Sequence, residues 1–135
     1  MDYIDYRKMK YSLFIKNLLE LLVDDVAMTN LQQQLNYIEI GNIDYTSQGV
    51  FIRFKRITGI ESFKFSKDDC VINGVIITSP QLRLGGEAIL HISKNYIDYL
   101  EIYSYDGEYP KEELKTYTLK QVWQSSSMLE IHNNS

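Results

Sequence analysis

Two strand-like segments with a very short connection constrain the fold of this chain most strongly. Residues 87–93, "EAILHIS", and residues 96–105, "YIDYLEIYSY", are rich in β-branched and aromatic side chains, and only Lys94 and Asn95 separate them. A two-residue connection joins antiparallel neighbours, because a parallel crossover needs about a dozen residues or more. The sequence therefore predicts a β-hairpin at this place, with an antiparallel sheet around it.

Helical periodicity precedes strand periodicity along the rest of the chain. Apolar residues recur at the spacing of an amphipathic helix over roughly residues 3–23, and a second, short helix is expected to hold Leu31 and Leu35 inward. From Tyr37 onward the side chains alternate as in strands, with "NYIEIGNIDY" and "GVFIRFKRI" on either side of the turn sequence "TSQG". Further strands are expected in "IESFKF", "VINGVIIT" and "YTLKQVW". Because the strands follow the helices, the sequence predicts an α+β fold in which an N-terminal amphipathic helix packs on a mainly antiparallel β-sheet.

Length and composition indicate one domain. A chain of 135 residues has the size of a single domain, and we expect residues 1–123 to form it, followed by a polar, mobile tail over residues 124–135. The single cysteine, Cys70, cannot form an internal disulfide, which favours the cytoplasm. No apolar run approaches the roughly 18 residues of a membrane-spanning helix, so no membrane association is expected.

Tyrosine is the most informative part of the composition, with 11 residues in the chain. Several of them alternate with acidic residues on one face of the second predicted hairpin strand, and the turn "YDGE" that follows adds further acids. Tyrosine suits protein interfaces because its ring can be buried by a partner while its hydroxyl keeps a hydrogen bond. The candidate partner-binding residues are Tyr99, Glu101, Tyr103, Tyr105, Asp106 and Glu108.

The charge of the chain indicates which kind of partner this face suits. The formal net charge is −4, and the carboxylates of the tyrosine-rich face would attract a basic protein partner and repel the phosphates of nucleic acid. The leading hypothesis is therefore a non-enzymatic protein-binding module. Two other interpretations of the same tyrosines stay open, namely packing within the chain's own sheet and burial in a homodimer.

A small enzyme or ligand-binding protein is the alternative hypothesis. With a two-residue loop in the hairpin, His91 would face Asp98 on the opposite strand, and Glu87 would lie on the same face, four residues before the histidine. A histidine oriented by an aspartate is half of a general acid–base constellation. An exposed polar pair on neighbouring strands is the simpler explanation of the same spacing, because no nucleophile, glycine loop or third partner is placed beside His91 and Asp98.

No metal or cofactor is expected from the sequence. The only other histidine, His132, falls in the predicted tail, and Cys70 has no thiol or histidine at the spacing of a zinc site. Gly85 and Gly86 precede a predicted strand, whereas phosphate-binding glycine loops precede a helix. We interpret the two glycines as a backbone feature at the entrance to the strand.

Residues 84–110, "LGGEAILHISKNYIDYLEIYSYDGEYP", which make up about a fifth of the chain, resemble a stretch found in small uncharacterised bacterial proteins. Some similarly built acidic α+β proteins act as immunity partners that neutralise toxin domains. The resemblance therefore implies an immunity-like role in which this chain would bind and neutralise a basic partner. It implies no particular functional residues.

Overall fold

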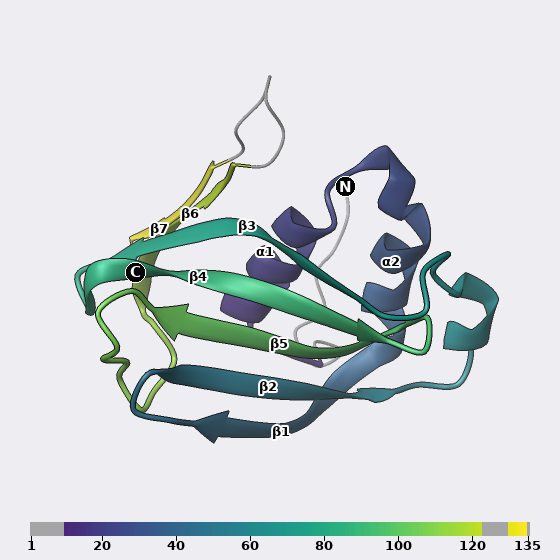
Figure 1. Ribbon diagram of the computed structural model, residues 1–135, viewed down its shortest axis with the longest axis horizontal. Coiled ribbons are helices and arrows are strands. Elements are labelled where there is room, and N and C mark those ends of the chain that lie inside the picture. The colour runs from purple at the N-terminus through teal and green to yellow at the C-terminus, as the bar shows by residue number, and fades with distance from the viewer. Residues whose placement is uncertain (1–9, 123–129, 135) are drawn as a thin grey trace.

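The computed structural model describes residues 10–122 and 130–134, and it confirms the α+β prediction. One antiparallel sheet contains seven strands in the order β1-β2-β5-β4-β3-β6-β7 (Figure 1). The strands are β1 (Ile38–Tyr45), β2 (Gly49–Arg56), β3 (Cys70–Ser79), β4 (Leu82–Ser93), β5 (Tyr96–Ser104), β6 (Thr116–Gln121) and β7 (Glu130–Asn134). The helical elements are α1 (Leu13–Leu22), α2 (Thr29–Gln34) and three 3-10 turns, η2 (Val26–Met28), η3 (Leu35–Tyr37) and η4 (Ile60–Phe63).

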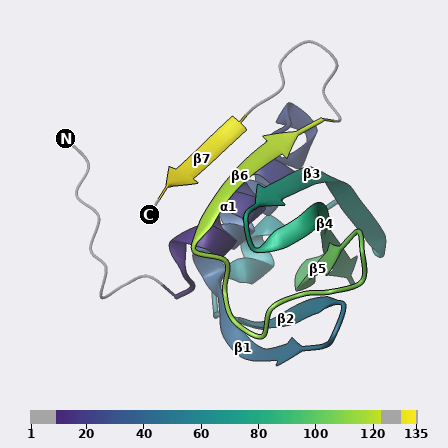
Figure 2. The same cartoon turned by 90° about the vertical axis from the view of Figure 1, so that its left-hand side faces the viewer.

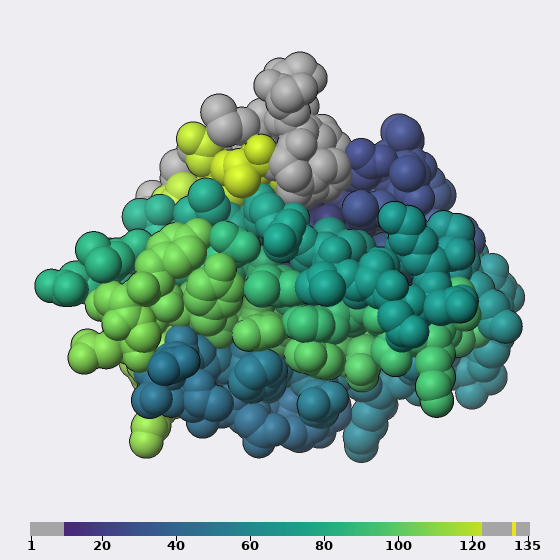
Figure 3. Space-filling model, in the orientation of Figure 1, coloured from purple at the N-terminus to yellow at the C-terminus, as the bar shows by residue number. Residues whose placement is uncertain are grey.

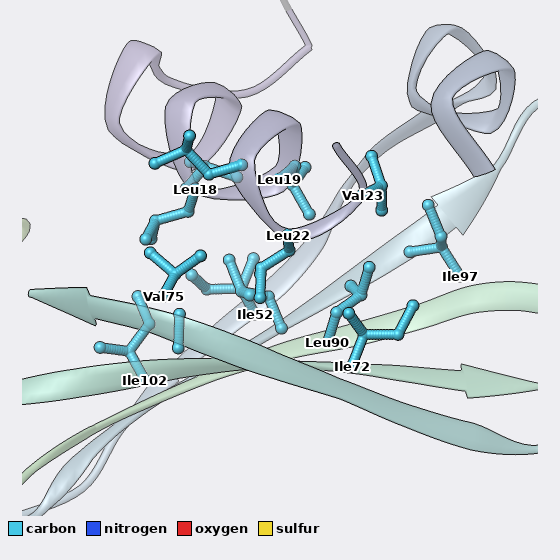
Figure 4. Close-up of a cluster of buried hydrophobic side chains, with 14 of the residues drawn as sticks. Leu18, Leu19, Leu22, Val23, Ile52, Ile72, Val75, Leu90, Ile97 and Ile102 are labelled. Carbon is cyan, nitrogen blue, oxygen red and sulfur yellow. The ribbon is translucent and has the colours of Figure 1, made fainter. Parts of the chain in front are cut away.

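Helix α1 packs on one face of the sheet, which curves around it (Figure 2). Ser12 caps the helix, since its side-chain oxygen accepts a hydrogen bond from the Ile15 N–H at 3.3 Å. The expected helix over 3–23 is therefore shorter where it is described, and its first predicted residues, 3–9, lie outside the described part. Leu18 and Leu22 are completely buried against the strands (Figure 4). Burial of such a leucine contributes about 1.5–3 kcal/mol, so this layer holds the helix on the sheet.

Both predicted hairpins are present. In the first, the Thr46 hydroxyl accepts hydrogen bonds from the N–H groups of Gln48 and Gly49, which closes the turn between β1 and β2. In the second, Lys94 and Asn95 have positive φ values of 53° and 75°, as a two-residue type I′ turn requires. The pairs next to this turn are those expected for a two-residue loop, with Ser93 opposite Tyr96 and Ile92 opposite Ile97.

The register of the second hairpin changes one pair further on, and the predicted pairing of His91 with Asp98 is wrong. The strands shift between His91 and Ile92, so that His91 lies opposite Tyr99 and Asp98 is the extra residue of a β-bulge. The cause is a break in the alternation of β5. Ile97 and Leu100 are both completely buried although they are three residues apart, which leaves Asp98 and Tyr99 together on the outward side.

Helix α2 is attached to this hairpin by a buried glutamine. Gln34 is completely buried, and its Nε2 donates hydrogen bonds to the carbonyl oxygens of Phe63 at 2.7 Å and Asn95 at 3.1 Å. Its Oε1 accepts a hydrogen bond from the Ile97 N–H at 2.9 Å. One side chain thus connects α2, η4 and the start of β5, immediately before the bulge.

Two further expectations differ from the structure. Residues 60–63 of the predicted strand "IESFKF" form the 3-10 turn η4, which follows Gly59 with its positive φ of 112°. Within the expected tail, Glu130–Asn134 pairs with β6 as strand β7, whereas residues 123–129 and 135 of that tail lie outside the described residues. No helix in the described part of the chain is long and apolar enough to cross a membrane.

Candidate functional site

The face of the sheet that points away from α1 carries the candidate residues. Along β5, Leu100, Ile102 and Ser104 are buried toward the helix, as the alternation of the sequence predicts. Glu101 and Tyr103 between them, and Tyr99 before Leu100, point to the opposite side and are partly exposed. The strands of this side form the surface seen in Figure 3, where α1 is almost completely hidden behind them. We call the outward side of β2, β5 and β4 the exposed face.

Tyr99 is the centre of an aromatic cluster on this face. Arg53 of β2 lies opposite it on one side, with Cζ 4.8 Å from the centre of the tyrosine ring. His91 of β4 lies opposite it on the other side, and the two rings stack with their centres 4.0 Å apart. Phe51 completes the cluster at 6.1 Å from Tyr99. Contacts on several sides therefore hold the Tyr99 ring in one orientation.

Glu101 connects this cluster to the rest of the face. It lies opposite Phe51 on β2, and its Oε1 is 3.1 Å from the Nε2 of His91. A carboxylate accepts about four hydrogen bonds, so one contact to His91 leaves accepting capacity for a partner. Glu101 is a partly exposed anion between aromatic rings.

A second cluster of tyrosines surrounds Glu87 of β4. Tyr103 lies opposite Glu87, and the Tyr105 hydroxyl donates a hydrogen bond to Glu87 Oε1 at 3.0 Å. The rings of Tyr103 and Tyr105 meet edge to face, with their centres 5.8 Å apart. Partial burial, followed by the hydrogen bond to Glu87 and the charge of Glu87, raises the pKa of Tyr105 to about 12. The pKa of Tyr103 is raised by the same kinds of effect, first by burial and then by Glu87 and Glu101.

A hollow of about 330 Å³ lies beside Tyr103 at the β1–β2 turn. Gly49 lies opposite Tyr103 and contributes no side chain there, while Phe51, two residues along β2, lines another side. A side chain at position 49 would not fit, because its Cβ would be 2.0 Å from the Ile102 carbonyl oxygen. Glu101 also lines this hollow, so it combines two aromatic rings with a carboxylate.

Two of the predicted acidic residues lie beyond the end of β5, in the turn and loop that follow it. Asp106 lies in the turn after β5, where its carboxylate accepts hydrogen bonds from the Ser104 hydroxyl and the Glu108 N–H. It also pairs with Arg83 at 3.4 Å, and only 10% of its side chain is exposed. The Glu108 backbone hydrogen bond is the main reason that the pKa of Asp106 is lowered. Asp106 therefore stabilises the turn, and Glu108 is an exposed residue just beyond it.

The alternative site at His91, Asp98 and Glu87 is not assembled. The bulge places Tyr99, not Asp98, opposite His91, and the described partner of His91 is Glu101. Glu87 is engaged by Tyr105, farther along the sheet. Within residues 10–122 and 130–134, no group of three or more histidine, cysteine, aspartate or glutamate side chains is arranged to hold a metal ion.

Sequence reasoning missed the contribution of β2 to the site. The alternation of "GVFIRFKRI" places Phe51 and Arg53 on one face of their strand, and both point outward in the structure. Nothing local in the sequence shows that this strand pairs with β5, about fifty residues later. Phe51 and Arg53 could have been assigned to the site only by recognising that β2 and β5 each have one buried, apolar side and pair with these sides on the same face of the sheet.

Comparisons of the chain with protein-family models, with curated proteins and with solved structures found no significant match. The resemblance of residues 84–110 to small bacterial proteins stays a prediction. The function is therefore argued from the exposed face itself.

Proposed function

We propose that the chain is a non-enzymatic protein-binding module and that the exposed face binds a protein partner with positively charged side chains. The observation that carries this proposal is the pair of aromatic clusters around Tyr99 and Tyr103, each in contact with a carboxylate. Tyrosine and arginine are, with tryptophan, the residue types that most often dominate binding energy at protein interfaces. Arg53 and three tyrosines lie together on this face.

The fixed positions of these side chains favour binding. Association orders mobile side chains at a cost of about 0.5–1.5 kcal/mol each, and rings already held in place avoid most of that cost. Tyr99 is held between Arg53 and His91, and Tyr105 is held by its hydrogen bond to Glu87. A partner would meet a surface that needs little rearrangement.

Charge favours a basic partner. Glu87, Asp98 and Glu101 are the carboxylates of the exposed face, and the whole chain has a formal net charge of −4. Complementary charge accelerates association and selects among partners. The face is nevertheless less acidic than the sequence indicates, because Asp106 is occupied within its turn and because Arg53 and Lys55, on the outward side of β2, add positive charge.

An immunity-like role in the cytoplasm, in which the chain neutralises a basic toxin domain, is part of this proposal. It rests on the acidic, tyrosine-rich face together with the resemblance of residues 84–110. Such a role needs tight binding and no chemistry at the site. It also explains why the face combines aromatic anchors with carboxylates rather than with a nucleophile.

A double variant tests the proposal. Tyr103→Ala with Glu101→Lys removes one ring and reverses one charge at partly exposed positions, so the fold should remain intact. The tagged wild-type chain and this variant are used to capture proteins from the source cells, and the captured proteins are quantified by mass spectrometry. We expect a basic protein to be retained by the wild type and lost by the variant. A matched control, Glu112→Lys, reverses a charge at an exposed loop position and should keep the partner.

Equal capture by the wild type and the double variant would contradict the proposal. Sedimentation of the purified chain separates a second explanation, in which the exposed face is buried between two copies. In that case the mass in solution would be twice that of the chain, and the double variant would sediment as a monomer.

A further inference from the structure

We propose that the hollow beside Gly49 binds an arginine side chain of the partner. This inference rests on the proposed function, because it names the group that the exposed face would recognise. The hollow lies where Gly49 faces Tyr103 on the neighbouring strand, and Phe51 and Glu101 line it as a second opposed pair. It is thus bounded by two aromatic rings and one carboxylate.

The walls of the hollow are formed before any ligand binds. The Thr46 hydroxyl accepts hydrogen bonds from the N–H groups of Gln48 and Gly49 and so fixes the β1–β2 turn. The Gln48 carbonyl oxygen in turn accepts a hydrogen bond from the Ser104 N–H at 2.9 Å, which ties the turn to β5. The glycine at position 49 is required because the backbones approach so closely there. The pairing of β2 with β5 and the closed turn therefore fix the positions of the backbone that lines the hollow.

The chemistry of the walls favours a cation. Aromatic faces attract cations, and a carboxylate forms charge-assisted hydrogen bonds with a guanidinium group. Glu101 keeps one accepting oxygen when Oε1 contacts His91. A phosphate or carboxylate ligand would be repelled by Glu101 and by Glu87 on the neighbouring strand.

The sheet already binds guanidinium groups in this way with its own arginines. Arg53 lies over the ring of Tyr99 with Cζ 4.8 Å from the ring centre, and Arg56 lies over Tyr96 at 4.6 Å. The hollow offers the same kind of ring, Tyr103, with no arginine of the described chain placed over it. A planar guanidinium can stack on such a ring and reach Glu101 at the same time, which a compact ammonium does less well.

The test is a titration of the full chain, followed by the backbone amide signals in NMR, with the blocked tripeptide acetyl-Gly-Arg-Gly-amide. We expect the amide signals of Gly49, Phe51 and Glu101 to shift. The matched probe contains citrulline in place of arginine, which keeps the shape and removes the charge. Its dissociation constant should be weaker by about tenfold or more, because the cation–aromatic and charge-assisted contacts are lost.

Two variants assign the binding to the hollow. Glu101→Gln should weaken binding of the arginine peptide by about tenfold while it keeps the size of the side chain. Glu112→Gln, the matched control at an exposed loop position, should leave it unchanged. Equal binding of the two peptides, or arginine-induced shifts that avoid the hollow, would overturn the assignment.

The outcome separates this inference from the proposed function. If the double variant at Tyr103 and Glu101 loses a partner but the arginine peptide does not bind in the hollow, the arginine-binding assignment of the hollow is refuted. The proposal that the exposed face binds a partner is then kept. If the hollow binds arginine and no partner depends on the face, the proposed function fails and the hollow remains.

Discussion

Replacement of Gln34 by leucine should destabilise the protein strongly, although the two side chains are similar in size. The Gln34 side chain makes three hydrogen bonds, to the carbonyl oxygens of Phe63 and Asn95 and from the Ile97 N–H. Leucine can make none of them. Because these bonds join α2 to the hairpin that carries the exposed face, the variant tests how the site is held in place.

The size of the effect follows from the burial of the groups involved. Ile97 is completely buried, so its N–H would be left without an acceptor, at a cost of about 1–3 kcal/mol. Each of the two lost donations from Nε2 adds about 0.5–1.5 kcal/mol. The Asn95 carbonyl oxygen still accepts from the Phe65 N–H at 2.9 Å and is not orphaned. We expect the free energy of unfolding to fall by about 2–6 kcal/mol in total.

Urea denaturation followed by circular dichroism measures this loss. The matched control is Gln33→Leu, the same substitution at the preceding, exposed position of α2, which should change the free energy of unfolding by less than about 0.5 kcal/mol. The reasoning is refuted if Gln34→Leu stays within about 1 kcal/mol of the wild type, the net worth of a single ordinary hydrogen bond.

Three further predictions concern the core and the exposed face. Leu18→Ala, at a completely buried position of α1, should lower the free energy of unfolding by about 3–5 kcal/mol in the same assay, and a loss below about 1 kcal/mol would contradict the packing of the helix on the sheet. Gly49→Ala should cost about 1–3 kcal/mol because the new Cβ would meet the Ile102 carbonyl oxygen at 2.0 Å, and a neutral effect would show that β2 and β5 do not approach so closely. Glu87→Gln should lower the pKa of Tyr105 from about 12 toward 10, as followed by the pH titration of the Tyr105 ring signals in NMR. An unchanged titration midpoint of Tyr105 in the variant would rule out Glu87 as a cause of the raised pKa. The raised pKa also implies that Tyr105 contributes to the stability of the fold below pH 10 and that this contribution disappears as the pH approaches 12.

Local patterns predicted most of the strands. The two residues between the strands of the second hairpin allow one tight turn, and Lys94 and Asn95 adopt its positive φ values. The alternation from Leu100 to Ser104 correctly assigned the buried side of β5. Both signals depend on neighbours in the sequence, which is why they could be interpreted without a structure.

The bulge was missed although the sequence contains a sign of it. Ile97 and Leu100 are three residues apart, and two inward apolar residues at that spacing require an extra outward residue between them. The loop length alone predicts a regular register, which led to the wrong pairing of His91 with Asp98. A one-residue change of register changes which side chains lie opposite each other, so Tyr99 and not Asp98 lies opposite His91 and the predicted acid–base pair is not formed.

Long-range contacts explain the other differences. Gln34 stands in the run "LQQQL", and nothing in that run distinguishes the buried glutamine from its exposed neighbour Gln33. The pairing of β2 with β5 brings Phe51 to Glu101, and that contact exists only after the sheet has formed. The acidic character of the site was overestimated because the partner of Asp106, Arg83, lies more than twenty residues earlier.

A photo-crosslinking side chain at position 103 tests the central claim most directly. Benzoylphenylalanine in place of Tyr103 reports which molecule contacts the exposed face in the source cells, and the same group in place of Val26, which is 95% exposed in η2, serves as the control. We predict an adduct from position 103, and none from position 26, with a protein whose crosslinked segment is rich in arginine and lysine. The absence of an adduct at position 103, or the same adducts from both positions, would contradict the claim that this face recognises a basic partner.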